Sequence, residues 1–477
     1  MVIEREDAQE VVKSYKEPIC LNLGSHSALD AWQGQRDYGL RSIIYTTPQR
    51  ARIYLQNPMV GKPGEEIEDL PEVAKRDLKV VNDPKDLKKS GSWRAAIIVL
   101  DKYSDIVKYI KELVELECIQ IPNRAFSAYV GGDEKCSVIE NKFGIPIIGS
   151  RKLLKIENRG EFEKDYYWFS EKAGIPYPKS YKFKITKNGI KFDEPIDEPM
   201  LLKAEHAHRR IEREFIFAAN SEDLEEKVRK EMAAGILDEE SLEKGRVEQI
   251  VLGPHANFNF FFSPLYAKED WGDLDNWYSK LYKTSMEDAR TCLANEFLSI
   301  DERRETILDG VKRMPIDVQE KLQKVPSFEV TAHVLMSLRE SLLKDVHRYA
   351  DMFLLAAKKY EPPGIIGAWC LQTLITWDKV SKYELAPKVK VDFTSGAEAK
   401  TAVDYGLYDV PKGGETFMHI PVTQDVALRH GGGTNVHMGI GSQYANAKYQ
   451  RTMSMGDRIA LEIRRAWKNK QLKEIVT

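Results

Sequence analysis

Two apolar segments in the C-terminal half most constrain the fold, because each carries an oxygen-bearing side chain in a strand-like run. Residues 364–372 end on Gln372, and residues 423–435 contain Asp425. As strands of one sheet, these segments could bring the amide oxygen of Gln372 to the carboxylate of Asp425. Mg²⁺ prefers oxygen ligands of this kind. The two segments therefore predict a sheet that carries a hard-cation site.

The residues after Asp425 indicate an anionic ligand. Arg429 stands four residues beyond the carboxylate, and residues 431–433 are consecutive glycines that would let the backbone approach an anion closely. Each feature alone is more often structural, since a lone carboxylate is usually solvated and a glycine run is usually a loop. Their order and combination with a metal site predict phosphate chemistry.

Several segments resemble one known family and keep its order from Leu23 to the C-terminus. They are residues 338–343, 362–372, 432–435 and 454–458. These segments look like those of the archaeal formate-dependent 5-formaminoimidazole-4-carboxamide ribonucleotide (FAICAR) synthetases, which belong to the ATP-grasp superfamily. That family formylates the amine of 5-aminoimidazole-4-carboxamide ribonucleotide (AICAR). The resemblance implies an ATP- and Mg²⁺-dependent ligase of purine (IMP) biosynthesis that consumes formate through a formyl phosphate.

Composition limits the classes of protein that fit. A chain of 477 residues is too long for one core, and we expect roughly two or three subdomains. The 71 Lys and Arg nearly balance the 74 Asp and Glu, so we expect neither a nucleic-acid partner nor a membrane surface. The five cysteines show no paired spacing, and the N-terminus is charged where a signal peptide is apolar. We therefore expect a cytoplasmic protein, and we expect it to form a homo-oligomer.

Residues 1–149 alternate strand-like and helix-like patterns. Residues 19–23 have the pattern of a buried strand, residues 24–27 that of a turn, and a helix then leads to a second strand at residues 43–45. This order is a βαβ unit, and a second unit follows from residue 95. The sequence therefore predicts a Rossmann-like domain, in which ligands bind beyond the carboxyl ends of the strands.

The turn after the first strand carries His26 and Ser27. A loop histidine is about as often bonded only to backbone, but the matching histidine of the resembled family contacts AICAR. The resemblance therefore implies substrate binding for His26 and Ser27, with the amides of the following helix near the phosphate. Residues 121–126 depart from the family, since Ala125 replaces a contacting serine and Arg124 replaces a glycine.

Residues 150–253 follow the order of an ATP-grasp nucleotide cleft: a strand that ends in lysine, a loop, a partner strand, a charged helix and a last strand. By resemblance, Lys203 would reach the ATP phosphates. Glu248 and the backbone of Ile250 and Val251 would meet the adenosine. A strand-end lysine in isolation would more often be solvated.

The loop of residues 204–214 contains no glycine, whereas the resembled family covers its phosphates with a glycine-rich loop. Cationic side chains could replace the missing backbone amides, because arginine binds phosphate through a planar fork. The candidates are His206, His208, Arg209 and Arg210. The alternative is that the chain binds ATP weakly or not at all.

Residues 254–477 form the predicted C-terminal ATP-grasp subdomain with the metal site. An aromatic strand at residues 258–262 alternates as a half-buried strand does. By resemblance, Glu305 touches ATP, and His333 takes the place of an asparagine that contacts the substrate. Residues 376–418 look like an insert, either an oligomer contact or a lid.

The predicted fold is therefore mixed α/β and α+β, a Rossmann-like N-terminal domain followed by a two-subdomain ATP-grasp fold. In the predicted reaction a carboxylate attacks the γ-phosphate of ATP and an amine captures the acyl phosphate, with Lys203 and Arg429 assisting. Gln372 and Asp425 would hold Mg²⁺, although the family has glutamate where this chain has Asp425. Two alternatives stay open: a ligase for another carboxylate or amine, and a non-catalytic nucleotide-binding paralogue.

Overall fold

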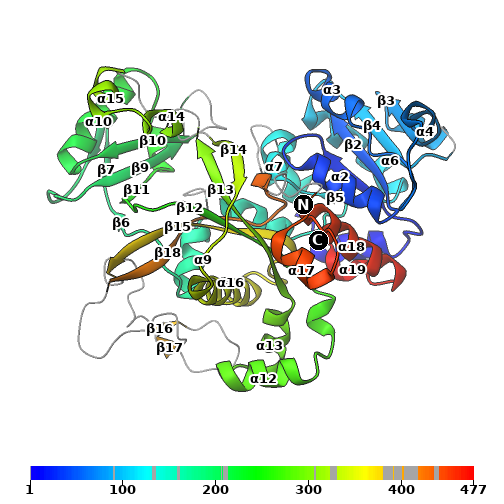
Figure 1. Ribbon diagram of the computed structural model, residues 1–477. Helices are drawn as coiled ribbons and strands as arrows, with labels where there is room; N and C mark the ends of the chain where they lie inside the picture. The colour runs from blue at the N-terminus through cyan, green and yellow to red at the C-terminus, as the bar shows by residue number, and fades with distance from the viewer. Residues whose placement is uncertain are drawn as a thin grey trace.

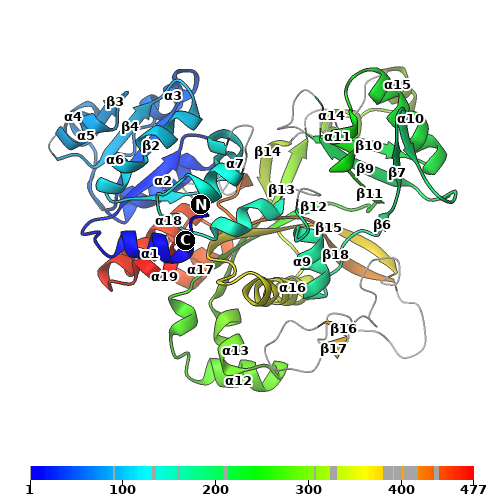
Figure 2. The same ribbon diagram turned by 180° about the vertical axis from the view of Figure 1, so that it is seen from behind.

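Figure 1 shows the computed structural model, in which two five-stranded sheets and one four-stranded sheet carry the architecture. It describes residues 2–89, 92–131, 136–157, 162–205, 207, 213–305, 308–322, 330–379, 390–391, 400–401, 417–433 and 440–477. Figure 2 gives the same arrangement from behind, with the N-terminal sheet and the four-stranded sheet at opposite ends. None of the helices in these ranges has the length and apolar composition of a membrane span.

The N-terminal sheet is parallel throughout, with the order β3-β4-β2-β1-β5. Its strands are β1 (Ile19–Leu23), β2 (Arg41–Thr46), β3 (Leu78–Val81), β4 (Ala95–Val99) and β5 (Cys118–Ile121). Side chains of α2 (Ala28–Asp37), α3 (Pro48–Gln56) and α4 (Leu70–Asp77) pack into one apolar cluster with the sheet. Side chains of η1 (Tyr103–Tyr109), α6 (Ile110–Glu115), α7 (Arg124–Gly131) and α8 (Cys136–Asn141) pack into another. Helices on both faces of a parallel sheet confirm the predicted Rossmann-like arrangement.

The four-stranded sheet is antiparallel, with the order β10-β9-β11-β6. Its strands are β6 (Ser180–Tyr181), β9 (Met200–Glu205), β10 (Arg213–Ala218) and β11 (Arg246–Gln249), and the ribbon of β7 (Lys184–Thr186) and β8 (Gly189–Lys191) lies beside them. Met200 and Leu202 share an apolar cluster with side chains of α10 (Ser221–Ala233) and α11 (Glu239–Glu243). Since successive side chains of a strand point to opposite faces, Lys203 faces away from these helices.

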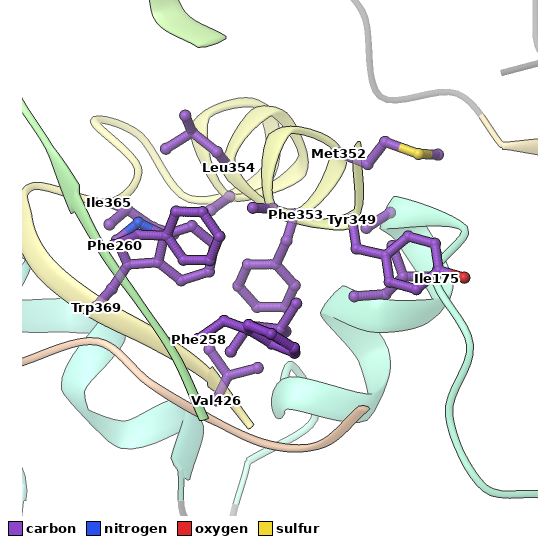
Figure 3. Packing of buried hydrophobic residues seen from close by; sticks show 14 of the residues in the cluster. Ile175, Phe258, Phe260, Tyr349, Met352, Phe353, Leu354, Ile365, Trp369 and Val426 are labelled. Carbon is purple, nitrogen blue, oxygen red and sulfur yellow. The ribbon is translucent and has the colours of Figure 1, made fainter. Parts of the chain in front are cut away.

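The second five-stranded sheet is antiparallel, with the order β14-β13-β12-β15-β18. Its strands are β12 (His255–Phe262), β13 (Asn295–Glu305), β14 (Val330–Leu335), β15 (Gly367–Lys379) and β18 (Phe417–Ala427). Figure 3 shows one face of this sheet packed on α16 (Glu340–Tyr360), where Phe258, Phe260 and Trp369 meet Phe353. Helix α9 (Tyr166–Ala173) covers the same cluster. The opposite face is therefore left for polar side chains.

The C-terminal helices return to the first domain, so the two chain ends lie close together in both views. They are α17 (Gln443–Tyr449), α18 (Met455–Lys468) and α19 (Leu472–Ile475), and they share a core with α1 (Arg5–Val12). Helix α18 begins at a capping box formed by Ser454 and Asp457. Helices α18 and α2 cross at Gly34 and Gly456, where a β-carbon on Gly34 would stand 2.2 Å from the Gly456 backbone.

Smaller elements connect these layers. They are α5 (Lys85–Lys89), η3 (Arg151–Glu157), η4 (Tyr266–Lys268), α12 (Asp273–Tyr282), α13 (Met286–Leu293), α14 (Leu308–Val311), α15 (Ile316–Leu322), β16 (Lys390–Val391) and β17 (Lys400–Thr401). The pairing of β15 with β18 continues to Lys379 and Phe417. The first residues of the predicted insert therefore belong to β15 and its last residues belong to β18. Most of the insert, and His206, His208, Arg209 and Arg210, lie outside the described residues. All five cysteines are buried free thiols.

Candidate functional site

The face of the second five-stranded sheet that points away from α16 carries a row of polar side chains. Asp301, Asn257, Gln372 and Asp425 pair directly with one another across β13, β12, β15 and β18. Directly paired residues project to the same face of a sheet, so the row lies on one surface. Asp301 and Asn257 are 0% and 4% exposed. Buried polar groups in such a row require partners, which makes this face the candidate site.

The two predicted metal ligands stand side by side in this row. The Asp425 carboxylate accepts a hydrogen bond from the Val426 amide at 3.0 Å. The Oε1 atom of Gln372 is buried and has no hydrogen-bond partner among the described residues. The described part of the chain holds no cluster of three or more His, Cys, Asp and Glu side chains suited to a metal. A cation bound here would therefore be coordinated by the Gln372 and Asp425 oxygens and by oxygens of molecules bound beside it.

A β-bulge next to this pair links it to the nucleotide-binding sheet. The register shifts after Gln372, so Gln424 is the extra residue of β18. Its Oε1 atom accepts a hydrogen bond from Lys203 Nζ at 3.2 Å. Lys203 thus lies beside the residue that precedes Asp425. The structure brings the predicted phosphate-binding lysine and the predicted metal pair to one place.

Lys203 and Glu248 form an ion pair with each other, whereas the family resemblance implies separate contacts of each with ATP. Both are buried, at 6% and 0% exposed. Tyr167 donates a hydrogen bond to the second Glu248 oxygen at 2.5 Å. Val251 packs with Ile420 and Val422 in a small apolar cluster, and Ile250 is half-buried beside it. These residues give this part of the nucleotide sheet a charged end and an apolar end.

Glu305 lies at the last position of β13, where it is 8% exposed. One of its carboxylate oxygens is 3.3 Å from His255 Nδ1. Its backbone amide donates to the Asp309 carboxylate at 2.6 Å. The structure therefore places Glu305 in a fixed position at the end of the polar face, within a local network of its own.

The other end of the site is built around the glycine turn of residues 431–433. A β-carbon on Gly432 would stand 3.6 Å from His333 Nε2 and 3.7 Å from His26 Nδ1. A β-carbon on Gly433 would overlap the Asp301 carboxylate at 2.3 Å, so this position requires glycine. His26, His333 and the glycine turn come from distant parts of the sequence and meet here.

Three arginines surround this end. Arg429 is buried, and its guanidinium is 3.1 Å from a Glu157 oxygen. Arg124 approaches the same oxygen at 3.6 Å. Arg50 donates hydrogen bonds to Ser25 Oγ at 2.6 Å and to a tyrosine hydroxyl. Three guanidinium groups lie at this end of the site and Glu157 pairs with two of them, so this end favours an anionic ligand.

The electrostatics of His26 reflect this surplus of positive charge. Partial burial, followed by the charges of Arg429, Arg124 and Arg50, lowers the pKa of His26 to about 4. His26 is nevertheless exposed to solvent, so water screens part of this effect. The ring is therefore neutral near pH 7. It can donate one hydrogen bond and accept another.

Ser27 and Ala125 flank the turn differently. The Ser27 hydroxyl is buried and has no hydrogen-bond partner in the described ranges of the chain. The Ala125 side chain lies in the apolar core of the first domain. Its amide donates to the Asn123 side chain, which in turn donates to the Leu23 and Ser25 carbonyls at 3.0 Å. Ser27 thus holds a buried hydroxyl without a partner among the described residues, whereas Ala125 supports the turn.

Several residues of the site were not singled out from the sequence. They are Arg50, Glu157, Asn257, Asn259 and Asp301. The asparagines did carry a signal, because they alternate with phenylalanines in the strand of residues 257–262. Polar residues at every second position of an aromatic strand predict a polar ligand-facing side. Arg50 and Glu157 reach the site only through tertiary packing, so no local pattern marks them.

Comparisons with known proteins agree with this architecture. The 5-formaminoimidazole-4-carboxamide-1-(beta)-D-ribofuranosyl 5'-monophosphate synthetase of Methanopyrus kandleri is 27% identical, over 100% of both chains. The synthetase of the same name from Methanobrevibacter smithii is also 27% identical, over 100% of this chain and 99% of its own. The crystal structure of an IMP biosynthesis protein PurP from Thermococcus kodakaraensis has a TM-score of 0.54 at 22% identity, covering 96% of this chain and 100% of that one. The shared fold confirms the predicted ATP-grasp architecture.

Family models match in two parts of the sequence. Residues 223–408 and 418–477 match the model described as Domain of unknown function (DUF1297), which covers more than half of the chain. Residues 20–181 match the model described as Protein of unknown function (DUF1246). The chain therefore belongs to the DUF1297 family, together with the archaeal 5-formaminoimidazole-4-carboxamide-1-(beta)-D-ribofuranosyl 5'-monophosphate synthetases.

Proposed function

We propose that the chain is an ATP- and Mg²⁺-dependent ligase that joins formate to the amine of AICAR and so forms FAICAR. The shared name of the full-length relatives supports these substrates. The observation that carries the proposal is the continuous polar face of the sheet. It has the Gln372 and Asp425 pair beside Lys203 at one end, and the two imidazoles with the arginines at the other.

At the first end, ATP would lie between the nucleotide sheet and the polar face. Lys203 would meet the phosphates, because its ammonium already projects toward the bulge beside Asp425. The apolar edge at Ile250 and Val251 suits the adenine ring, and Glu248 suits the ribose hydroxyls or the adenine amine. Glu305 would complete the contact from the end of β13. These roles follow the resemblance and agree with where each residue lies.

The residues present fit a magnesium ion. Gln372 contributes a buried oxygen without a partner, and Asp425 contributes a carboxylate in the directly paired position. When bound, Mg²⁺ would supply positive charge against the charge that develops on the transferred phosphoryl group. Gln372 and Asp425 would hold it. The shorter reach of aspartate relative to the family glutamate is compatible with a water molecule in the coordination shell.

At the second end, the phosphate of AICAR would occupy the pocket of Arg50, Arg124 and Arg429. Arginine binds phosphate through two parallel hydrogen bonds, which suits a dianion. The neutral His26 ring and the Ser27 hydroxyl would add donors, next to the first amides of α2. His333 would then face the base rather than the phosphate, since its Nε2 lies beside Gly432 of the glycine turn.

The proposed reaction has two steps. A formate oxygen attacks the γ-phosphorus of ATP, the bond to ADP breaks, and formyl phosphate forms. The amine of AICAR then attacks the formyl carbon, and inorganic phosphate leaves. Lys203 stabilises the charge on the transferred phosphoryl group, and Arg429 stabilises anionic groups at the glycine turn. An enzyme nucleophile is not required.

The same site also suits a ligase with another carboxylate or amine. Arg124 favours this second candidate, because a guanidinium stands where the resembled family has a glycine and lies 3.6 Å from Glu157 in the substrate pocket. The added bulk and charge would change the shape of the acceptor pocket. The first step of the reaction would be unchanged.

The test is to incubate the purified chain with ATP, Mg²⁺, formate and AICAR and to measure ADP and FAICAR. We expect both products in equal amounts, and no FAICAR when any substrate is left out. ADP that appears only with another carboxylate or amine supports the second candidate. If calorimetric titration with MgATP gives no binding heat and no substrate panel yields ADP, the ligase proposal is overturned in favour of a non-catalytic paralogue.

A further inference from the structure

Asp301 and His333 form a hydrogen-bonded pair on the polar face. His333 Nδ1 lies 2.7 Å from Asp301 Oδ2, and the Asp301 carboxylate is 0% exposed. Asn257 donates to the same oxygen at 2.8 Å, and Asn259 donates to the other oxygen at 2.7 Å. Asp301 is thus held by three side chains from β12 and β14, and its position is fixed.

The protonation state of this pair follows from its partners. Burial alone would raise the pKa of Asp301, but the hydrogen bonds from His333, Asn257 and Asn259 outweigh burial and hold it below the ordinary value. An ionised carboxylate accepts hydrogen bonds only, so Nδ1 of His333 must carry a proton. In the neutral ring Nε2 then carries the lone pair, a tautomer assigned from this partner.

The lone pair of His333 points into the substrate end of the site. Nε2 is the His333 atom that would lie nearest a β-carbon on Gly432, opposite Nδ1 of His26. Gln372 is two strands away from Asp301 along the row. At about 5 Å per strand, the metal pair and Asp301 are separated by roughly 10 Å. A phosphoryl group and a formyl group can occupy that space.

We propose that His333, oriented by Asp301, is the general base that accepts the proton of the acceptor amine during acyl transfer. This inference rests on the proposed ligase function. As the amine nitrogen attacks the acyl carbon, the new carbon–nitrogen bond forms and the bond from carbon to the phosphate oxygen breaks. The phosphate leaves with the electron pair, and the amine proton moves to Nε2. The imidazolium that results keeps its Nδ1 hydrogen bond to Asp301 and is stabilised by that charge.

An asparagine at this position, as in the resembled family, could bind the amine but could not accept its proton. A positioned general base contributes about 10²–10⁴-fold to rate. His333 therefore adds a function that binding alone would not supply. The charged and titratable groups that face it are Asp301 and its register partner Arg303 on β13, and His26 across the glycine turn.

The experiment compares His333→Asn with wild type in the rapid-quench rate of FAICAR formation, measured at about pH 5 to 8, the range in which imidazoles titrate. We expect the wild-type rate to rise with pH through one ionisation. In the variant we expect a loss of about 10²-fold or more, a flat profile in this range, and partial rescue by added imidazole. The titration of His26 lies near pH 4 and falls outside this range.

His419→Asn is the matched control, because His419 lies on the surface beside Arg339. It should keep the wild-type rate and profile. Unchanged ATP binding and thermal stability of His333→Asn would show that the variant is folded. If His333→Asn is not folded, His333→Gln, which keeps more of the side-chain volume, is used in its place.

A variant that retains the wild-type pH dependence, or whose loss of rate is the same at every pH without imidazole rescue, overturns the proposal. A wild-type chain that makes no FAICAR overturns the proposed FAICAR-forming function instead.

Discussion

At the scale of single residues, the β-bulge between β15 and β18 holds several buried polar atoms. These atoms have no hydrogen-bond partner among the described residues. They are Gln372 Oε1, Thr423 Oγ1 and Gln424 Nε2. A buried polar group without a partner costs about 1–3 kcal/mol. Concentrating such groups at one bulge is unfavourable unless a ligand supplies the partners. We therefore regard the bulge as the place where the phosphates and the metal contact the protein.

Asp425→Ala should abolish ligation, because the metal would lose its charged ligand. We expect the rate of ADP formation at fixed Mg²⁺ to fall by about 100-fold or more, since even outer-shell losses cost about 10–100-fold in metal affinity. Asp425→Glu, which restores the family residue, should keep measurable activity. The control is Asp193→Ala, because Asp193 lies on the surface paired with Lys184. Wild-type turnover in Asp425→Ala would exclude the metal role.

A second prediction concerns how the buried ion pair of Lys203 and Glu248 contributes to stability. Lys203→Met leaves Glu248 buried without its counter-charge and should lower the free energy of unfolding by about 3–5 kcal/mol. The double variant Lys203→Met with Glu248→Leu should recover most of that loss, because no buried charge remains unpaired. Urea unfolding measures the stability, and MgATP titration measures binding.

ATP binding should be lost in both of these variants. Recovery of stability without recovery of ATP affinity would separate the structural role of the pair from its role toward ATP. A double variant that binds MgATP as tightly as wild type would show that Lys203 does not hold the phosphates.

At the scale of elements, the strands and helix ends with strong local patterns could be predicted from the sequence. The apolar run of residues 364–372, the aromatic strand of residues 258–262 and the cap at Ser454 all carry such patterns. The register that sets Gln372 opposite Asp425 depends on pairing between strands far apart in the chain. The Asp301 row depends on three such pairings, so the polar face became visible only when the sheet was assembled.

The hydrogen bond between Tyr278 on α12 and Asp351 on α16 predicts a pH-dependent stability. Burial raises the pKa of Asp351 on α16 to about 7, against the opposing hydrogen bond from Tyr278 on α12. The folded protein thus holds a proton that the unfolded chain releases above about pH 4. This contribution is fully present below that pH and is lost as pH rises through about 7.

Asp351→Asn should abolish this dependence, because the amide can accept the Tyr278 hydrogen bond without a proton. We expect the stability of wild type relative to Asp351→Asn to fall between pH 4 and 7, by at most about 1.4 kcal/mol per pH unit. Urea midpoints at pH 5 and pH 8 measure the difference, with Asp193→Asn as the surface control. A constant difference between wild type and variant at both pH values would contradict the assignment.

At the scale of the whole molecule, the site is assembled from separate structural units. The turn after β1 supplies His26, the nucleotide sheet supplies Lys203, and the second five-stranded sheet supplies the polar face between them. Helix α18 holds the first domain in place through the glycine crossing with α2, and the Gly456 amide donates to the Asp30 carboxylate at 3.1 Å. His430 also meets this carboxylate, at 2.9 Å, just before the glycine turn. These contacts therefore fix the turn after β1 beside the glycine turn.

This division predicts that the two substrates can be weakened separately. His26→Asn is the variant of choice, because His26 has φ 46° and asparagine tolerates the left-handed region. We expect it to raise the Kd for AICAR by about 10-fold, as loss of one hydrogen bond to a charged group costs about 1.5–3 kcal/mol and asparagine restores part of it. The Kd for MgATP should stay unchanged. In the double variant at Lys203 and Glu248, the Kd for MgATP should rise and the Kd for AICAR should stay unchanged. Calorimetric titration of each variant with each substrate alone measures both Kd values. Equal weakening of AICAR and MgATP by His26→Asn would show that the ribonucleotide does not bind at the turn after β1, and the arginine pocket would then need another ligand.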